Sequence, residues 1–365
     1  MKLVQRGMKR ISILGALAIL GISSSANAQT ITWPTPNDIA TFMQNAQTAS
    51  TVCASIEVAP GVTVPIPCIT NMPKPPVDAP DAALPSNAFA PAAVDLRTQG
   101  LVGSVKDQAQ VGVCWSFAVS SVLENSMRRQ QRGDTIAPLH VIASGTWNDI
   151  WNKGGKEPLA QEIAWPYVPR KACEFADSDD DCGRTYGVRA GSWRSDPVLV
   201  AERQRAQTMG VATAGKARAL KGDTVGQIVT ALASGRAVYA GIGIDGSAWD
   251  YRGAKNGVLA PYQSESRGGH AVTLIGYRTV GERQFLIQNS WGKDWGQGGY
   301  VWMGESELRK HIHDAFILDA TPVGSAPVVT VPIPNTSTAP TTFTLPPVQL
   351  CPSGLPSVLG QCWLG

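Results

Sequence analysis

The chain has 365 residues, of which 43% are hydrophobic and 16% are charged, so it can bury a sizeable core. This length accommodates one domain of roughly 200–250 residues together with flanking segments. The formal net charge of +3 comes from four basic residues within positions 1–28, and the remaining 27 basic residues face 28 acidic ones. Such a balance argues against a nucleic-acid partner.

The first 28 residues have the pattern of a signal peptide. A basic start precedes the apolar run Ile11–Ile22, and the small-x-small sequence Ala26-Asn27-Ala28 follows as a cleavage site. A membrane anchor is the alternative, but a spanning helix needs about 20 apolar residues. No other stretch is apolar enough to span. We therefore expect a secreted or periplasmic protein without a stable membrane span.

Residues 29–90 form a Pro-rich N-terminal extension or prosegment. Proline disfavours helices, so this composition predicts extended segments or linkers. The hexapeptide Val-Thr-Val-Pro-Ile-Pro occurs at 62–67 and again at 329–334. The repeat marks either two related strands or chance in a biased composition.

Residues 91–320 have an ordinary globular composition and predict an α+β domain. The apolar spacing of residues 114–132 predicts a helix, with cations at its C-terminal turn. Buried strands are expected over residues 237–244, 271–277, 284–288 and 300–303. A helical first half and a strand-rich second half exclude alternating βαβ units. Residues 321–365 form a Pro/Thr-rich C-terminal extension.

A reactive cysteine is expected at the junction of a loop and the first predicted helix, within residues 106–118. Free N–H groups and the dipole at a helix N-terminus favour the thiolate of Cys114, which is the nucleophilic form. A buried structural cysteine is the alternative. Gly269-His270-Ala271-Val272 and Gln288-Asn289-Ser290-Trp291-Gly292 follow much later and can supply a base and its orienting group.

These three motifs, in the order Cys, His and Asn, resemble those of papain-like cysteine proteases. The resemblance covers roughly residues 92–318 and implies a two-lobe fold. A helical lobe and a β-barrel-like lobe would form a cleft that holds the active site. His270 lies 156 residues after Cys114, whereas this family has roughly 130–150. We therefore expect inserted residues within 183–222.

The resemblance also implies roles for individual residues in a secreted endopeptidase. Cys114 would attack the peptide carbonyl, and His270 would act as acid and base, with Asn289 fixing its ring. The side chain of Gln108 would donate to the oxyanion. Trp291 would cover the His–Asn bond. Residues expected to contact the substrate are Gly154, Gly155, Gly241, Ala271 and Trp291.

Six cysteines remain when Cys114 is set aside, and they fall into three close pairs along the chain. In an oxidising compartment the simplest disulfides are Cys53–Cys68, Cys173–Cys182 and Cys351–Cys362, although six cysteines allow fifteen connectivities. Zinc is the competing explanation. No Cys-x-x-Cys pair exists, however, and only four histidines do, so neither a metal nor another cofactor is expected.

The expected partners are protein or peptide substrates and the chain's own prosegment. Residues 29–90 are too short and too Pro-rich for the long prosegment helix of this family, but extended chain could still occlude the cleft. Cleavage between about Pro80 and Val94 would release it. Two alternatives stay open: a non-catalytic surface or binding protein on a protease-like shell, and acyl transfer to an acceptor other than water.

Overall fold

The computed structural model of the chain describes residues 52–68, 90–144, 157–176, 182–263 and 268–324. The chain divides into two compact units, residues 1–48 and 49–365, and every described residue belongs to the second. The predicted signal peptide, most of the C-terminal extension and the second copy of the hexapeptide lie outside the described residues. So do Gly154, Gly155, Cys351 and Cys362.

A long buried helix, α2, carries Cys114 at its first residue. It ends at Arg129, three residues earlier than predicted, because Gln131 adopts a positive φ of 60°. The Arg132 N–H then bonds back to the Met127 carbonyl, which closes the helix in the manner of a Schellman motif. The described helices are α2 (Cys114–Arg129), α3 (Pro138–Ala143), α5 (Pro169–Phe175), α6 (Cys182–Tyr186), the 3-10 turn η2 (Ser192–Ser195), α7 (Pro197–Thr208), α8 (Thr224–Ala233), α9 (Gly246–Trp249) and α10 (Glu305–His311).

Six strands from the second half of the chain form an antiparallel sheet in the order β10-β9-β8-β7-β11-β6, and β3 joins it beside β8 as a seventh strand. A second sheet has the order β12-β5-β4, and β1 and β2 form a hairpin. The strands are β1 (Val52–Ala59), β2 (Val62–Pro67), β3 (Val94–Asp95), β4 (Leu159–Ala160), β5 (Gly210–Ala214), β6 (Arg218–Ala219), β7 (Val238–Ile244), β8 (Gly268–Val280), β9 (Glu282–Gln288), β10 (Tyr300–Gly304), β11 (Ile312–Ile317) and β12 (Ala320–Pro322).

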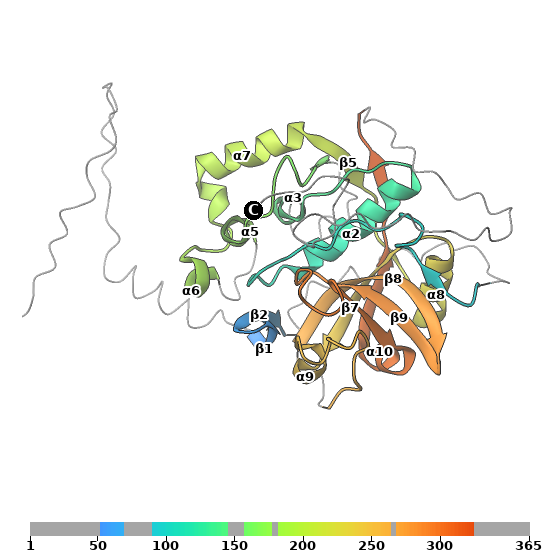
Figure 1. The fold of residues 1–365 in the computed structure, drawn as a ribbon. Helices are drawn as coiled ribbons and strands as arrows, with labels where there is room; N and C mark the ends of the chain where they lie inside the picture. Colours follow the sequence, from blue (N-terminus) through green and yellow to red (C-terminus); the bar gives the residue numbers. More distant parts are fainter. Residues whose placement is uncertain (1–51, 69–89, 145–156, 177–181, 264–267, 325–365) are drawn as a thin grey trace, which may run out of the picture. The chain divides into compact units, whose positions relative to one another are not determined.

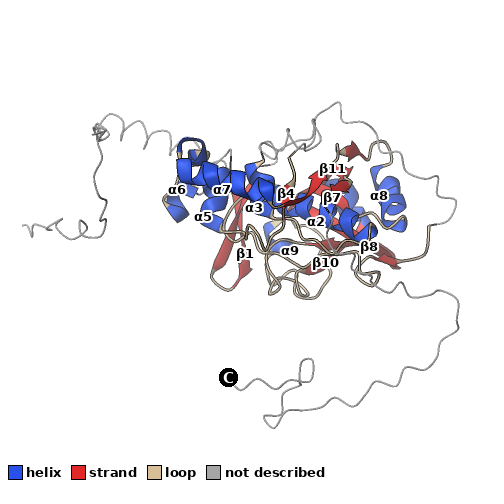
Figure 2. Cartoon of the chain, turned by 90° about the horizontal axis from the view of Figure 1, so that it is seen from above, coloured by secondary structure: helices blue, strands red, loops and turns tan. Residues whose placement is uncertain are grey.

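The α+β prediction is confirmed. Helices α3, α5 and α7 gather on one side of α2, and strands β7, β8 and β9 lie on its other side (Figure 1). Seen from above, α5, α6 and α7 lie on the side of α3 away from β7 and β11 (Figure 2). Apolar residues of α2 and of the central strands join in one buried cluster. The four predicted strands are present as β7, β8, β9 and β10, with ends that differ by up to three residues.

The region in which inserted residues were expected, 183–222, holds most of α6 together with η2, α7, β5 and β6. A disulfide joins Cys173 in α5 to Cys182 at the start of α6, as the spacing of these cysteines predicts. Cys68 is also disulfide-bonded. The side chain of Cys53 lies outside the description, so its pairing with Cys68 stays a prediction.

A buried ion cluster supports the loop before α2. The ammonium of Lys106 lies 3.0 Å from Glu124 and 2.6 Å from Glu162, and the Glu124 side chain is fully buried. Glu124 also accepts the Ile136 N–H. A Cβ at Gly103 would lie 1.9 Å from a Glu124 oxygen, so only glycine leaves room for this carboxylate. Because a buried charge without its partner is costly, the cluster holds Lys106 firmly, two residues before Gln108.

Candidate active site

Helix α2 and strand β8 bring Cys114 and His270 together. The Cys114 side chain is 3% exposed, and its Sγ accepts a 3.4 Å hydrogen bond from the Ala271 N–H. Ala271 follows His270 directly in β8. No acidic side chain occupies the first turn of α2, and no side chain caps its N-terminus. The positive end of the helix dipole therefore acts on the sulfur unopposed by a local carboxylate.

The imidazole of His270 is held at one nitrogen. Its Nε2 lies 2.7 Å from Asn289 Oδ1, and donation to this amide oxygen leaves Nδ1 as the second ring nitrogen. That Nδ1 is buried and has no hydrogen-bond partner among the described residues. The geometry thus fixes the ring while one nitrogen stays available for proton transfer with a neighbouring group.

Burial controls the charge of His270. The residue is completely buried, which lowers its pKa to about 4, while the hydrogen bond with Asn289 acts in the opposite direction. The imidazole is therefore neutral at pH 7 in this structure, unless a negative charge is placed beside it.

Asn289 and Trp291 follow strand β9 and complete the histidine's surroundings. Asn289 Oδ1 also accepts the Ser290 N–H, which orients the amide. The indole of Trp291 stacks on the His270 ring, with ring centres 4.6 Å apart and planes 25° apart. Both residues are 3% exposed, so the His270–Asn289 bond is shielded from water.

Gln108 is buried and is fixed through both ends of its side-chain amide. Its Nε2 donates to the Val111 carbonyl at 2.8 Å, and its Oε1 accepts from the Ser290 hydroxyl at 2.6 Å. The Tyr167 hydroxyl donates to the Gln108 backbone carbonyl at 2.9 Å. The Nε2 group carries a second hydrogen besides the one donated to Val111.

Sequence reasoning missed Ser290 and Tyr167. Ser290 stands within the Asn-Ser-Trp-Gly motif, so its proximity to Asn289 was visible, but its bond to Gln108 spans 182 positions. Tyr167 lies 59 positions from Gln108 and belongs to no motif. Of the expected substrate contacts, Gly241 and Ala271 are directly paired between β7 and β8, one residue from His270.

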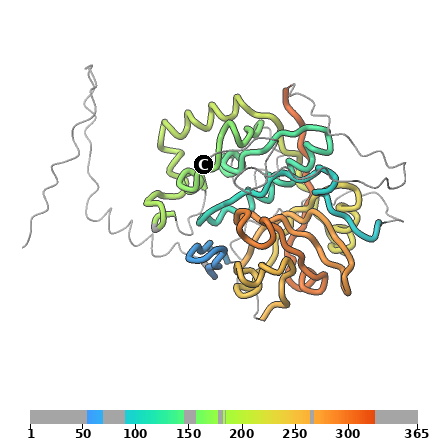
Figure 3. Tube along the Cα trace, in the orientation of Figure 1, coloured from blue at the N-terminus to red at the C-terminus, as the bar shows by residue number. Residues whose placement is uncertain are grey.

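The hairpin β1–β2 lies against the same site. The end of β2 pairs with the start of β8 through an antiparallel bridge between Cys68 and Gly268, two residues before His270. A Cβ at Gly268 would lie 2.4 Å from Cγ2 of Ile66, so glycine allows β2 to approach closely. Strand β1 is held to the rest of the domain by the Tyr251 N–H, which donates to the Glu57 carbonyl at 2.9 Å. Figure 3 shows the hairpin, in blue, beside the domain.

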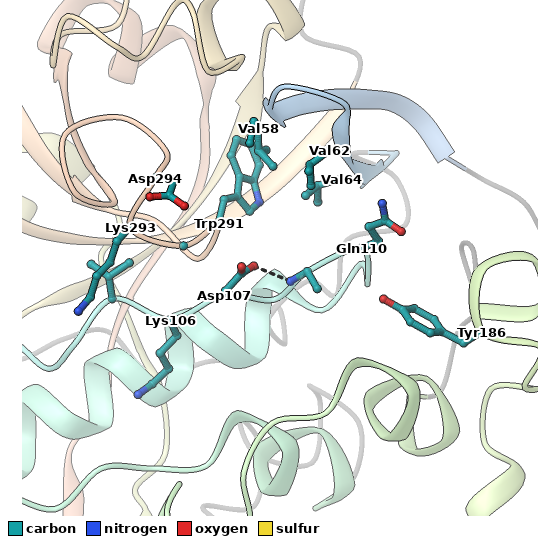
Figure 4. Close-up of a pocket in the computed structure, with 14 residues that line it drawn as sticks. Val58, Val62, Val64, Lys106, Asp107, Gln110, Tyr186, Trp291, Lys293 and Asp294 are labelled. Carbon is teal, nitrogen blue, oxygen red and sulfur yellow. Dashed lines mark hydrogen bonds between the residues drawn. The ribbon is translucent and has the colours of Figure 1, made fainter. Parts of the chain in front are cut away.

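A cavity of about 630 Å³ lies between the hairpin and the domain. Val58, Val62 and Val64 of the hairpin face Trp291 across it, and polar side chains line the remaining wall (Figure 4). These polar residues are Lys106, Asp107, Gln110, Tyr186, Lys293 and Asp294. The cavity therefore adjoins the indole that covers His270.

The described residues also bear on two other kinds of site. No helix there is long and apolar enough to cross a membrane. No group of three or more His, Cys, Asp or Glu side chains there is placed to hold a metal ion.

Comparison with known proteins finds one family model, described as papain family cysteine protease, over residues 90–317. Cathepsin K of Gallus gallus is 26% identical over 225 residues, which are 58% of each protein. A cathepsin L-like peptidase of Aedes aegypti is 28% identical over 234 residues, 61% of each. The chain thus spans about three-fifths of the length of these curated relatives.

Among solved structures, procathepsin L 3 from the larval midgut of Tenebrio molitor has a similar fold. The match has a TM-score of 0.50 at 20% sequence identity, and it covers 68% of this chain and 76% of that one.

Proposed function

Because the chain belongs to the papain family of cysteine proteases, we propose that it hydrolyses peptide bonds with Cys114 as nucleophile and His270 as acid and base. One arrangement carries this proposal. His270 bonds to Asn289 at 2.7 Å, and the sulfur of Cys114 accepts a hydrogen bond from Ala271, the next residue of β8. Labelling with an epoxide inhibitor of thiol proteases, followed by mass spectrometry, tests it. Modification of Cys114 supports the proposal, and an unmodified Cys114 contradicts it.

The reaction proceeds in two steps. The Cys114 thiolate attacks the peptide carbonyl, and the resulting oxyanion accepts hydrogen bonds from the Gln108 amide and the Cys114 backbone N–H. His270, protonated at Nδ1, gives its proton to the leaving amine, and a thioester remains on Cys114. A water molecule then attacks this thioester, and His270 takes a proton from that water. The carboxylic acid product leaves, and the Cys114 thiolate is restored.

Replacement of Gln108 by alanine should lower kcat by about 10²-fold, the scale for the loss of one oxyanion donor. The Michaelis constant should change less, because the bond strengthens only as the oxyanion forms. Steady-state kinetics with a fluorogenic peptide amide measure both. Since Gln108 Oε1 also accepts from the Ser290 hydroxyl, Ser290→Ala is the matched control for loss of that bond alone. An effect of Gln108→Ala confined to the Michaelis constant would make Gln108 a substrate contact instead.

The rate of hydrolysis should be bell-shaped in pH. A thiolate beside His270 raises the pKa of the imidazole, and the imidazolium lowers the pKa of the thiol below its usual value of about 8.5. Burial, partly offset by the Asn289 hydrogen bond, lowers the pKa of His270 to about 4, so the thiolate must outweigh this desolvation for the pair to form. Activity then rises at acid pH as the thiol ionises and falls at alkaline pH as His270 loses its proton. A profile that rises only near pH 8.5 would mean that His270 stays neutral.

We further propose that residues 29–90 are a prosegment, that the chain is exported after cleavage near Ala28, and that the mature enzyme begins between about Pro80 and Val94. The hairpin β1–β2 supports the first part, because it packs Ile66 against Gly268 beside the catalytic histidine. The relative from Tenebrio molitor is itself described as a procathepsin.

A further inference from the structure

Four aromatic rings pack against one another at the proposed active site. They belong to His270, Trp249, Trp291 and Trp295. Trp249 and His270 meet in a T-shaped arrangement, with ring centres 5.8 Å apart and planes 84° apart. The same indole stacks on Trp295 at 5.8 Å and meets Trp291 edge-on at 6.0 Å. Trp291 in turn stacks on His270. Trp291 also meets Trp295 edge-on at 5.3 Å, so Trp249 and Trp291 each contact the other three rings.

The position of Trp249 is set by polar contacts at both ends of the residue. Its backbone carbonyl accepts from the Trp295 indole N–H at 2.9 Å. Its own Nε1 donates to the Tyr262 hydroxyl at 2.7 Å, and that hydroxyl donates to the Gly243 carbonyl at 2.9 Å. Gly243 is paired with Gly269, which directly precedes His270. One hydroxyl therefore ties the indole to the strand pair that carries the catalytic imidazole.

The surroundings of Tyr262 keep this hydroxyl in place. The phenol ring stacks on His311 at 4.2 Å, and the Tyr262 N–H bonds to Glu307 at 3.3 Å. Burial raises the pKa of Tyr262 well above its ordinary value, so the hydroxyl keeps its proton and can accept from Trp249 while donating to Gly243. Packing alone would be served equally well by phenylalanine, which cannot make either bond.

We propose that Trp249 and Tyr262 are positioning residues that hold the His270 ring in line with Cys114. This inference rests on the proposed cysteine-protease function. A buried indole N–H without an acceptor is costly, so loss of the Tyr262 hydroxyl shifts Trp249. This shift weakens the contact between the Trp249 and His270 rings. Small displacements of a catalytic group lower the rate strongly without a matching change in substrate binding.

The test replaces Tyr262 by phenylalanine in the full chain. We expect kcat for a fluorogenic peptide amide to fall about tenfold and the Michaelis constant to stay within about twofold. Tyr277→Phe is the matched control, because that buried residue also donates one hydroxyl hydrogen bond, at 2.8 Å to the Pro91 carbonyl, far from His270 along β8. Equal kinetic losses in the two variants would overturn the inference.

The rate of Cys114 alkylation by iodoacetamide against pH separates this inference from the function on which it rests. In the wild type, an acid limb well below pH 8.5 supports the cysteine–histidine pair, and a free-thiol profile refutes the proposed function itself. In Tyr262→Phe the His270 ring is held less firmly, which weakens the cysteine–histidine pair. The acid limb of the alkylation profile should therefore shift to higher pH by at least about half a unit. If the wild-type acid limb lies well below pH 8.5 and the limb of Tyr262→Phe lies at the same pH, the positioning role is overturned while the proposed function stands.

A second variant covers the case in which Tyr262→Phe does not fold. Trp249→Phe removes the N–H that requires an acceptor and should lower kcat with the same shift of the alkylation profile. In the double variant the two losses should be less than additive, because both residues act through one contact. Full additivity in the double variant, or an unshifted profile in Trp249→Phe, overturns the inference.

Discussion

Replacement of Cys114 by alanine should abolish peptide hydrolysis, with a loss of at least about 10³-fold in kcat. The sulfur is the atom that would form the thioester, and among the described residues no other cysteine is shown outside a disulfide. Hydrolysis of a fluorogenic peptide amide, measured on purified protein, gives the result. Circular dichroism and the urea midpoint should stay near those of the wild type, since a small buried group is lost from the end of a helix.

Cys114→Ser is the matched control for this prediction, because it keeps a polar atom of similar size at the same place. It should also be nearly inactive, since a serine hydroxyl ionises far less readily than a thiol. Appreciable turnover in folded Cys114→Ala protein would contradict the assignment of the nucleophile.

Displacement of the hairpin should raise the activity of the unprocessed chain. Ile66 is 1% exposed and meets Gly268, so Ile66→Arg removes an apolar contact and would bury a charge. The apolar contact alone is worth about 1.5–3 kcal/mol, which corresponds to about a 10–100-fold shift in the docking equilibrium. We therefore expect residues 29–365 with this change to hydrolyse a peptide amide at least about tenfold faster than the unchanged form.

Thr63→Lys is the control, because it adds a cation at an exposed position of the same strand. It should leave the activity of the unprocessed chain unchanged. A complementary experiment compares residues 29–365 with residues 91–365 and adds the isolated 29–90 peptide to the shorter form. Full activity of the longer form, together with no inhibition by the added peptide, would rule out a prosegment.

The proposed catalytic residues could be singled out in the sequence because each one stands in a local motif. Cys114 opens an apolar helix, His270 follows two glycines before a strand, and Asn289 precedes Ser-Trp-Gly. The α+β class followed from the order of helical and strand patterns. What is local in the chain, such as a helix start or a run of buried strand residues, is visible without the fold.

The supporting contacts were not predictable, because they join residues far apart in the chain. Trp249 and Tyr262 carry no motif, and the ties from Tyr167 and Ser290 to Gln108 arise only on folding. Strand β8 begins at Gly268, earlier than predicted, because pairing with Ile244 overrides the weak strand preference of glycine. The Pro-rich flank was expected to be extended, but nothing in its composition indicates which surface it contacts.

The bridge between Cys68 and Gly268 bears on which polypeptides could bind as substrates. Strand β9 pairs with β8 only from Thr273 onward, so the first residues of β8 have a backbone edge that β9 does not cover. If β2 is released, as we propose, that edge could take another extended chain, whatever its side chains, by main-chain hydrogen bonding. We therefore expect unfolded or locally melted polypeptides to be cleaved far faster than the same sequences held in helices.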